Sequence, residues 1–177
     1  FDESVDVLVV GSGCGGLTSA LTAKISGANE VLVIEKGNLI GGTSATSGGV
    51  IWIPDNHHAS ELGAEDSIAE AKEYLKATIP EDEFNEPMID AYLSEGPKMV
   101  KFLEEHTDVK YAPIEHYPDY FQDAPGVKQG FRSLEPVSVS AETLGDDVDN
   151  LHPSGPQTIV FGRYGVDFNE SHSISLQ

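Results

Sequence analysis

Three glycines directly follow a short apolar run near the start of the sequence. Val7 to Val10 lead into Gly11, Gly13 and Gly16, which form a G-x-G-x-x-G pattern. In such a pattern the first glycine permits a tight turn out of a strand, the second lets the main chain approach a pyrophosphate, and the third lets a helix pack closely on the sheet. The helix that follows offers free N–H groups to phosphate. The pattern therefore predicts a dinucleotide site.

An acidic residue stands where the ribose of such a ligand would lie. A helix opening near Cys14 and stopping at Gly27 is predicted to precede a second strand, Val31 to Ile34, which closes on Glu35. A carboxylate about 20 residues beyond the glycine loop accepts hydrogen bonds from both ribose hydroxyls of an adenosine. It would repel a 2′-phosphate, so NADP is disfavoured.

A second segment rich in glycine and hydroxyl groups follows the acid. It runs from Lys36 to Gly49 and enters the bulky stretch Val50 to Pro54. Its N–H groups and hydroxyls suit a large polar ligand, whereas a flexible linker would not run straight into bulky apolar residues. We interpret Cys14, the only cysteine, as a slim packing residue of the first loop, and a disulfide framework is excluded.

The middle of the chain reads as helical. Apolar spacing predicts one helix over residues 64–75, capped by Asp66 or Ser67, and another over residues 87–105, which Gly96-Pro97 should bend or split. We expect both apolar stripes to face a core.

The remainder of the chain is less regular. A short strand is predicted around residues 109–114, and Glu142 to Asn150 is predicted to be a surface loop. The tail after Gly165 shows little periodicity, so no element is predicted there. His57 and His58 would point to opposite faces of an extended segment, with no spaced ligand nearby, so no metal site is expected.

Composition restricts the partners. The chain has 177 residues and a formal net charge of −20, which disfavours nucleic acid and anionic membranes. No apolar run is long enough to span a membrane, and no signal sequence is visible, so a cytoplasmic location is the default expectation.

Taken together, these segments resemble the start of a flavoprotein of the fumarate reductase and 3-ketosteroid Δ1-dehydrogenase superfamily. The ketosteroid branch is favoured by Gly41 to Gly49 and by Trp52-Ile-Pro-Asp-Asn56. The other matching segments are Gly11 to Gly16, Val33 to Lys36, Tyr117 to Pro125 and Arg132 to Pro136.

The resemblance implies an α/β fold: a Rossmann-like FAD-binding domain, with a parallel sheet and flanking helices, followed by the start of a substrate-side region. It implies FAD, with residues 1–63 as the FAD-binding unit, 64–107 as an attached helical segment and 108–177 as an incomplete substrate-side region. The implied cofactor residues are Gly11, Ser12, Gly13, Cys14, Gly15, Gly16, Glu35, Lys36, Gly42, Thr43, Ser44, Thr46, Ser47, Gly48 and Gly49.

The implied reaction is 1,2-desaturation of a 3-ketosteroid, with a base removing a C2 proton and the C1 hydride passing to flavin N5. Tyr120 matches a tyrosine that lines the steroid site and supports the base; Tyr117 is a weaker candidate, and Phe121 departs from the family pattern. The partners implied are a small carbonyl compound, an unidentified electron acceptor, and the rest of the polypeptide or a second chain.

Family members are much longer, and their other catalytic groups have no match here. We therefore expect an N-terminal part that is inactive alone. The alternatives are a fumarate-type reductase of C=C bonds, a nucleotide-binding fragment without chemistry, and the NAD-binding domain of an ordinary dehydrogenase. The last would continue with regular strand and helix alternation after the acid, which this sequence does not.

Overall fold

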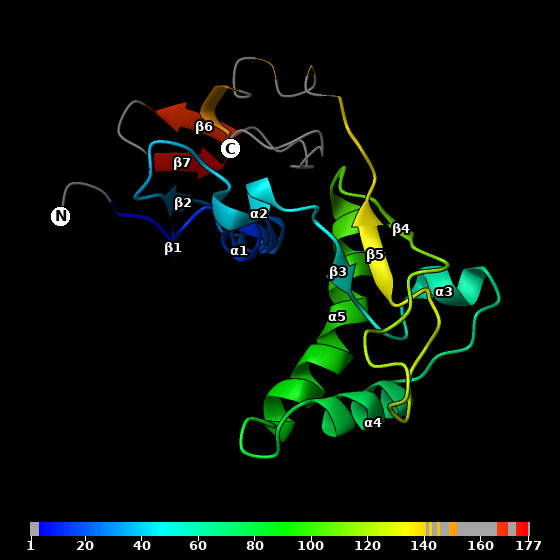
Figure 1. Cartoon of the computed structure of the whole chain (residues 1–177). Helices are drawn as coiled ribbons and strands as arrows, with labels where there is room; N and C mark the ends of the chain where they lie inside the picture. Colours follow the sequence, from blue (N-terminus) through cyan, green and yellow to red (C-terminus); the bar gives the residue numbers. More distant parts are fainter. Residues whose placement is uncertain are drawn as a thin grey trace. The chain divides into compact units, whose positions relative to one another are not determined.

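The structure, a computed structural model, describes residues 4–140, 142, 145, 149–151, 166–169 and 173–176. The chain forms two compact units, Phe1–Gly49 with Ser138–Gln177, and Val50–Val137 (Figure 1). The predicted boundaries after residues 63 and 107 separate parts of the chain by the ligand that each is expected to bind. They stay a prediction. The predicted loop from Glu142 to Asn150 lies largely outside the described residues. Among the described helices, none has the length and apolar character needed to cross a membrane.

The first unit opens with the predicted strand, helix and strand. β1 (Val7–Val10) and β2 (Val31–Ile34) are parallel and in register, with Val7 opposite Val31, and α1 (Cys14–Ile25) connects them. Gly27 follows α1 with a φ of +102°, and its N–H donates to the Lys24 carbonyl. The predicted start of an α/β fold is confirmed.

Packing of α1 on one face of this sheet forms the core of the first unit. Leu17 and Ala20 of α1 pack with Val31, Val33 and Ile40, all of which are buried. Strand alternation turns the other β1 side chains to the opposite face, where Leu8 and Val10 are exposed. One face of β1 therefore packs against the core through the half-buried Val7 and Val9, and the other is exposed.

Two features of the first unit were not predicted. The tail forms β6 (Val166–Asn169) and β7 (Ser173–Leu176), and the sheet has the order β1-β2-β7-β6, with β7 antiparallel to β2. No element was predicted in the tail, because these short strands depend on pairing, of β7 with β2 and of β6 with β7, rather than on their own periodicity. The glycine-rich segment after β2 also forms a helix, α2 (Gly42–Thr46).

The second unit combines helices with a small antiparallel sheet. Its elements are β3 (Ile51–Trp52), α3 (His57–Glu61), α4 (Ile68–Thr78), α5 (Glu86–His106), β4 (Tyr111–Pro113) and β5 (Ser133–Pro136). β5 lies between β3 and β4. Ile53, Val100 and Leu134 form the buried cluster of this unit.

The two long helices confirm the predicted pattern and correct its details. α4 begins after Ser67, whose hydroxyl accepts from the Glu70 N–H, so Ser67 rather than Asp66 is the cap. The prediction that Gly96-Pro97 bends or splits this helix is wrong as to the split, because α5 is continuous through Pro97. Of its apolar stripe, Leu93, Val100 and Leu103 are buried.

Two members of the predicted α5 stripe lie at the surface instead. Met88 is 69% and Tyr92 is 45% exposed. The Tyr92 hydroxyl donates to the Trp52 carbonyl, which fixes the ring over β3 without burying it.

A buried arginine holds the second unit together. Arg132, 1% exposed, donates to Asp66 at 2.9 and 2.7 Å and to Asp119 at 2.7 Å. Asp119 also accepts from the Trp52 indole at 2.6 Å. Burial raises the pKa of the Asp66 carboxyl, but the hydrogen bonds from Arg132, the charge of Arg132 and the N–H groups of Asp55 and Ser67 together outweigh it and hold the pKa below its usual value. Arg132 thus forms ion pairs with both Asp66 and Asp119.

Candidate cofactor site

The glycine loop between β1 and α1 has the backbone geometry that its sequence predicts. Gly11 has a φ of +100°, and its N–H donates to the Ile34 carbonyl at 2.7 Å, which ties the turn to the end of β2. A Cβ on Gly16 would lie 2.0 Å from the Gly11 carbonyl oxygen. Glycine is therefore required at position 11 by conformation and at position 16 by close packing.

Glu35 is the hydrogen-bonded centre of this loop. Its Oε2 accepts from the N–H and the hydroxyl of Ser12, at 2.9 and 2.7 Å, and its Oε1 accepts from the Gly37 N–H at 2.9 Å. These bonds, led by that of the Ser12 hydroxyl, lower the pKa of Glu35 from 4.5 to about 2. Glu35 is therefore an anion that fixes the loops on either side of it.

The two glycine-rich segments, far apart in sequence, meet at this point. Ser12 is fully buried, and its hydroxyl also accepts from the Gly41 N–H at 3.0 Å. The Ser44 hydroxyl accepts from the Cys14 N–H at 3.1 Å, at the first residue of α1. A Cβ on Gly42 would lie 4.0 Å from the Gly13 Cα. The structure thus brings together two segments that were assigned to one ligand from sequence alone.

Glycine also shapes the turn into α2. Gly41 has a φ of +100°, and a Cβ there would lie 2.5 Å from the Ala45 Cβ. Two of the hydroxyls in this segment make three local bonds: Thr46 donates to the Thr43 carbonyl, and Ser47 donates to the Ser44 carbonyl and accepts from the Gly49 N–H. Thr43, Thr46, Ser47 and Gly48 are exposed, as is Lys36 after β2.

The start of α1 has the features of an anion-binding site. The N-cap residue, Gly13, has no side chain to cap this helix, and the first turn carries no acidic residue, so apart from the bond from the Cys14 N–H to Ser44 the positive end of the helix is open to an anion. A Cβ on Gly13 would meet only the Ser44 hydroxyl, at 3.8 Å, and one on Gly15 would meet nothing within 4 Å. Internal packing therefore does not require glycine at position 13, whereas close approach of a diphosphate would. The described residues fit FAD at this point.

Tyr120 lies in the second unit, in the segment that the resemblance assigned to substrate. Its side chain is 80% exposed and borders a pocket of about 560 Å³ that is also lined by Thr78 and Phe121. Its hydroxyl lies 3.2 Å from that of Tyr117, and this contact raises the pKa of Tyr117. The Phe121 N–H donates to the Tyr74 hydroxyl at 3.1 Å, which anchors the segment on α4.

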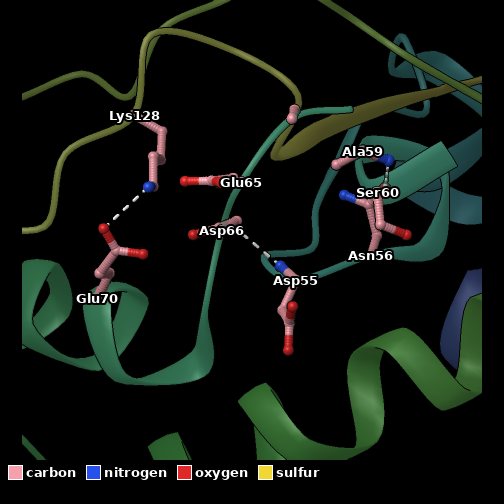
Figure 2. Close-up of a pocket in the computed structure, with 9 residues that line it drawn as sticks. Asp55, Asn56, Ala59, Ser60, Glu65, Asp66, Glu70 and Lys128 are labelled. Carbon is pink, nitrogen blue, oxygen red and sulfur yellow. Dashed lines mark hydrogen bonds and ion pairs between the residues drawn. The ribbon is translucent and has the colours of Figure 1, made fainter. Parts of the chain in front are cut away.

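A second pocket in this unit, of about 370 Å³, is lined by four acidic side chains and Lys128 among other residues (Figure 2). Two of its carboxylates are paired with cations of the protein. Lys128 binds Glu70 at 2.9 Å, and Asp66, which binds Arg132, also accepts from the Asp55 N–H at 3.0 Å. Burial and the charge of Asp66 raise the pKa of Asp55. This pocket is thus an extension of the Arg132 network.

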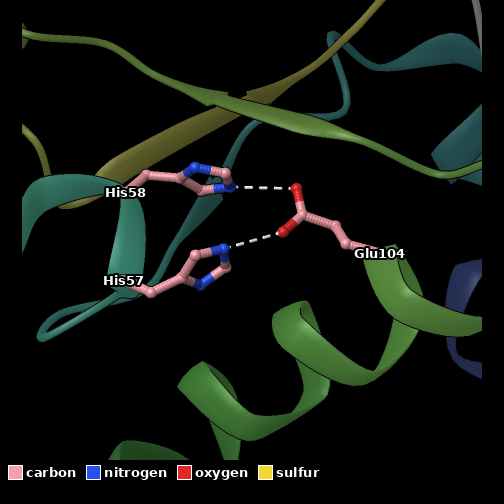
Figure 3. A group of neighbouring side chains, drawn as sticks. All are labelled: His57, His58 and Glu104. Atoms are coloured by element: carbon pink, nitrogen blue, oxygen red, sulfur yellow. Dashed lines mark hydrogen bonds and ion pairs between the residues drawn. The ribbon is translucent and has the colours of Figure 1, made fainter. Parts of the chain in front are cut away.

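The two adjacent histidines are placed differently from the prediction. They open α3, and both Nε2 atoms face Glu104 of α5, at 3.0 Å for His57 and 2.9 Å for His58 (Figure 3). The expectation of opposite faces was wrong because the segment is helical rather than extended. The carboxylate that sequence spacing did not reveal comes from a residue more than 40 positions away.

The fold and this loop geometry define a class of protein. The family model of the FAD-binding domain matches residues 6–172, and the chain belongs to that family. The expected fold class and cofactor are thereby confirmed at the level of the family.

Relatives of the chain are flavoprotein dehydrogenases. It is 41% identical to a 4-oxocyclohexanecarboxylate 2-dehydrogenase of Sinomonas cyclohexanicum, over 92% of this chain and 28% of that protein. It is 41% identical to a 3-oxosteroid 1-dehydrogenase of Mycobacterium tuberculosis, over 86% and 27% respectively.

A solved structure shows the same fold. The 3-ketosteroid Δ1-dehydrogenase of Sterolibacterium denitrificans, in complex with 1,4-androstadiene-3,17-dione, matches with a TM-score of 0.78 and 41% identity, over 85% of this chain and 26% of that one. The chain thus spans about a quarter of the length of the relatives it matches.

Proposed function

We propose that this chain is the FAD-binding part of an oxidoreductase that dehydrogenates a carbon–carbon bond beside a ring ketone. The observation that carries the proposal is the meeting of two glycine-rich segments at the start of α1, next to the anionic Glu35. The relatives named as dehydrogenases of 4-oxocyclohexanecarboxylate and of 3-oxosteroids support it, since both names describe an oxo-substituted ring.

The residues of the first unit divide the binding of FAD between them. The N–H groups at the start of α1 bind the diphosphate, with Gly13 leaving room for it. Glu35 binds the adenosine ribose through Oε1, because Oε2 already accepts two hydrogen bonds from Ser12. Ser12, being buried, acts by holding the loop, and the exposed residues Thr43, Thr46, Ser47 and Gly48 are proposed to contact the rest of the cofactor.

FAD supplies the hydride acceptor of the reaction. Tyr120 is proposed to line the substrate site and to support the base that removes the C2 proton. Its exposure at a pocket and the hydroxyl of Tyr117 beside it support this role. The finer assignment is 1,2-desaturation of a 3-ketosteroid.

Titration of the purified chain with FAD, followed by flavin fluorescence, tests the cofactor site. We expect saturable binding that Gly13→Val abolishes and Glu35→Ala weakens about tenfold or more, since an uncharged replacement loses the ribose contact and frees the loop. Thr22→Ala, at an exposed position further along α1, is the matched control and should bind like the parent. Equal affinity in the parent and the Gly13 and Glu35 variants would overturn the proposed site.

The substrate is tested separately, on the full-length protein with an artificial electron acceptor. We expect turnover of a 3-ketosteroid, reduced by Tyr120→Phe through kcat more than through KM. Turnover of 4-oxocyclohexanecarboxylate alone would keep the reaction class and change the substrate.

One observation favours a second candidate, a reductase of C=C bonds. The flavoprotein subunit of an acrylate reductase from Shewanella woodyi is 40% identical over 68 residues, which is 38% of this chain. Reduction of acrylate or fumarate by the full-length protein, without dehydrogenation of either ketone, would establish that candidate instead.

A further inference from the structure

We propose that His57, His58 and Glu104 form a binding site for a divalent transition metal, with Zn²⁺ as the best-matched ion. The three side chains come from two helices of the second unit and offer one ligand atom each, all within 4.8 Å of one another. Figure 3 shows both imidazole rings directed at the same carboxylate. This site is separate from the glycine-loop site in the first unit.

The distances fit a shared cation. The His57 Nε2 lies 3.0 Å from Glu104 Oε2, and the His58 Nε2 lies 2.9 Å from Glu104 Oε1. Zn–N and Zn–O bonds of about 2.1 Å place two ligand atoms about 2.9 Å apart at a right angle and about 3.4 Å apart at a tetrahedral angle. The two observed N–O separations lie close to this range, and the three ligand atoms lie within 4.8 Å of one another, so the side chains need to move only a short way to admit the ion.

The ligand types select the ion. Two imidazoles with one carboxylate suit Zn²⁺ and its neighbours in the first transition row, whereas Mg²⁺ and Ca²⁺ prefer oxygen ligands. The ligand side chains are partly accessible, being 30%, 19% and 11% exposed for His57, His58 and Glu104. An ion can therefore enter and keep a water ligand. The net charge of −20 attracts cations to the surface in general.

The three metal-binding side chains differ in how well neighbouring groups hold them in place. Glu104 Oε1 also accepts from the Tyr111 N–H at 2.8 Å, which ties the carboxylate to β4. The Nδ1 of His58 lies 3.9 Å from Glu61, an exposed carboxylate that can move closer. The Nδ1 of His57 is buried and has no hydrogen-bond partner among the described residues.

The lack of a hydrogen-bond partner for the Nδ1 of His57 determines the affinity that we expect for Zn²⁺. Hydrogen-bond partners behind the ligands change metal affinity by about 10–100-fold. With His57 lacking such a partner, we expect a micromolar rather than a nanomolar dissociation constant for Zn²⁺. Because the ligands join α3 to α5, and Glu104 is bonded to β4, Zn²⁺ should also raise the melting temperature of the chain.

The test is a calorimetric titration of the purified chain with ZnCl₂ at neutral pH, in an excess of Mg²⁺ that occupies sites built from oxygen ligands alone. The site variant is His57→Gln/His58→Gln, and the matched control is His106→Gln/His116→Gln, which removes two exposed imidazoles elsewhere in the same unit. We expect one equivalent of Zn²⁺ to bind the parent and the control alike, and the site variant to bind at least about tenfold more weakly.

Two further measurements separate metal binding from a structural role of the histidines. Glu104→Gln keeps the size of the side chain and should lose Zn²⁺ affinity as well, and melting curves in a chelator show whether each variant folds. Co²⁺ should give visible d–d bands in the parent and the control but not in the site variant.

Equal Zn²⁺ binding by both double variants would overturn the proposal, as would the absence of saturable binding by the parent. Either result would mean that the three residues only join α3 to α5 through hydrogen bonds and bind no metal ion.

Discussion

At the scale of single residues, Glu35 does more than the sequence pattern assigned to it. The pattern predicted a ribose acceptor, and the structure shows a carboxylate that already accepts three hydrogen bonds from Ser12 and Gly37. Three bonds to one anion hold the glycine loop and the segment after β2 in a fixed relation before any ligand arrives. Preorganisation of this kind lowers the cost of binding.

Replacing Glu35 by glutamine tests this role without a ligand. Glutamine has the same shape but turns an NH₂ group toward donors, so Glu35→Gln should lower the free energy of unfolding by about 1–3 kcal/mol at neutral pH. Because the pKa of Glu35 is lowered from 4.5 to about 2, its contribution is complete above pH 4.5 and is lost as the pH falls toward 2. Urea denaturation at several pH values should therefore show the gap between parent and variant closing in that window.

The exposed Glu30, at the start of the same segment, provides the control. Glu30→Gln should change the free energy of unfolding by less than about 0.5 kcal/mol. A gap for Glu35→Gln that persists unchanged down to pH 2 would contradict the role of the charge.

At the scale of secondary structure, the elements that could be predicted were those whose signal is local. β1, α1, β2 and α4 are each encoded by spacing within a dozen residues, and the glycine pattern adds the turn between them. The pairing of β7 with β2 depends on residues about 140 positions apart, and no local pattern reports it.

The same reasoning applies to the site residues. The two glycine-rich segments were predicted to share a ligand because motif chemistry assigned each one, and Ser44 does reach the start of α1. The pairing of Arg132 with Asp66 and of His58 with Glu104 joins residues that only the folded chain brings together. Ser12 was predicted as a ligand contact, and nothing in its neighbours in sequence indicated that it is fully buried.

The continuity of α5 through Pro97 gives a prediction at this scale. Proline has no N–H to bond the carbonyl four residues back and its ring crowds that carbonyl, at a cost of about 3 kcal/mol inside a helix. Proline also restricts the unfolded chain, which offsets part of this cost, so Pro97→Ala should raise the free energy of unfolding by about 1–2 kcal/mol. Pro87→Ala, in the first turn where proline removes no bond, should change it by less than about 0.5 kcal/mol. Chemical denaturation measures both, and equal effects would contradict this explanation.

The Arg132 network gives a second prediction at this scale. Arg132→Met would leave Asp66 and Asp119 buried without a cation, at a cost of about 3–5 kcal/mol. Lys101→Met removes an exposed pair with Glu105 at 3.9 Å and should cost about 0.5 kcal/mol or less. Thermal melts of both variants decide this, and similar small losses would show that Arg132 is not required for packing.

At the scale of the whole molecule, the second unit has the construction of an independent domain. Its first and last strands, β3 and β5, pair with each other, with Ile51 opposite Leu134, so the chain enters and leaves the unit at one place. Termini that lie close together and a core within one segment are typical of a domain that folds alone. The buried cluster of Ile53, Val100 and Leu134 lies wholly within it.

We therefore expect residues 50–137, produced alone, to fold and to melt cooperatively. The same segment with Arg132→Met is the control: a loss of about 3–5 kcal/mol is a large part of the stability of a small domain and should lower its melting temperature by about 12–40 °C. Circular dichroism melts and amide hydrogen exchange would measure both. A gradual, uncooperative melt of the parent segment would mean that the second unit needs the first unit in order to fold. The division of the chain at Gly49 and Val137 would then separate two groups of contacts and not two independently folding domains.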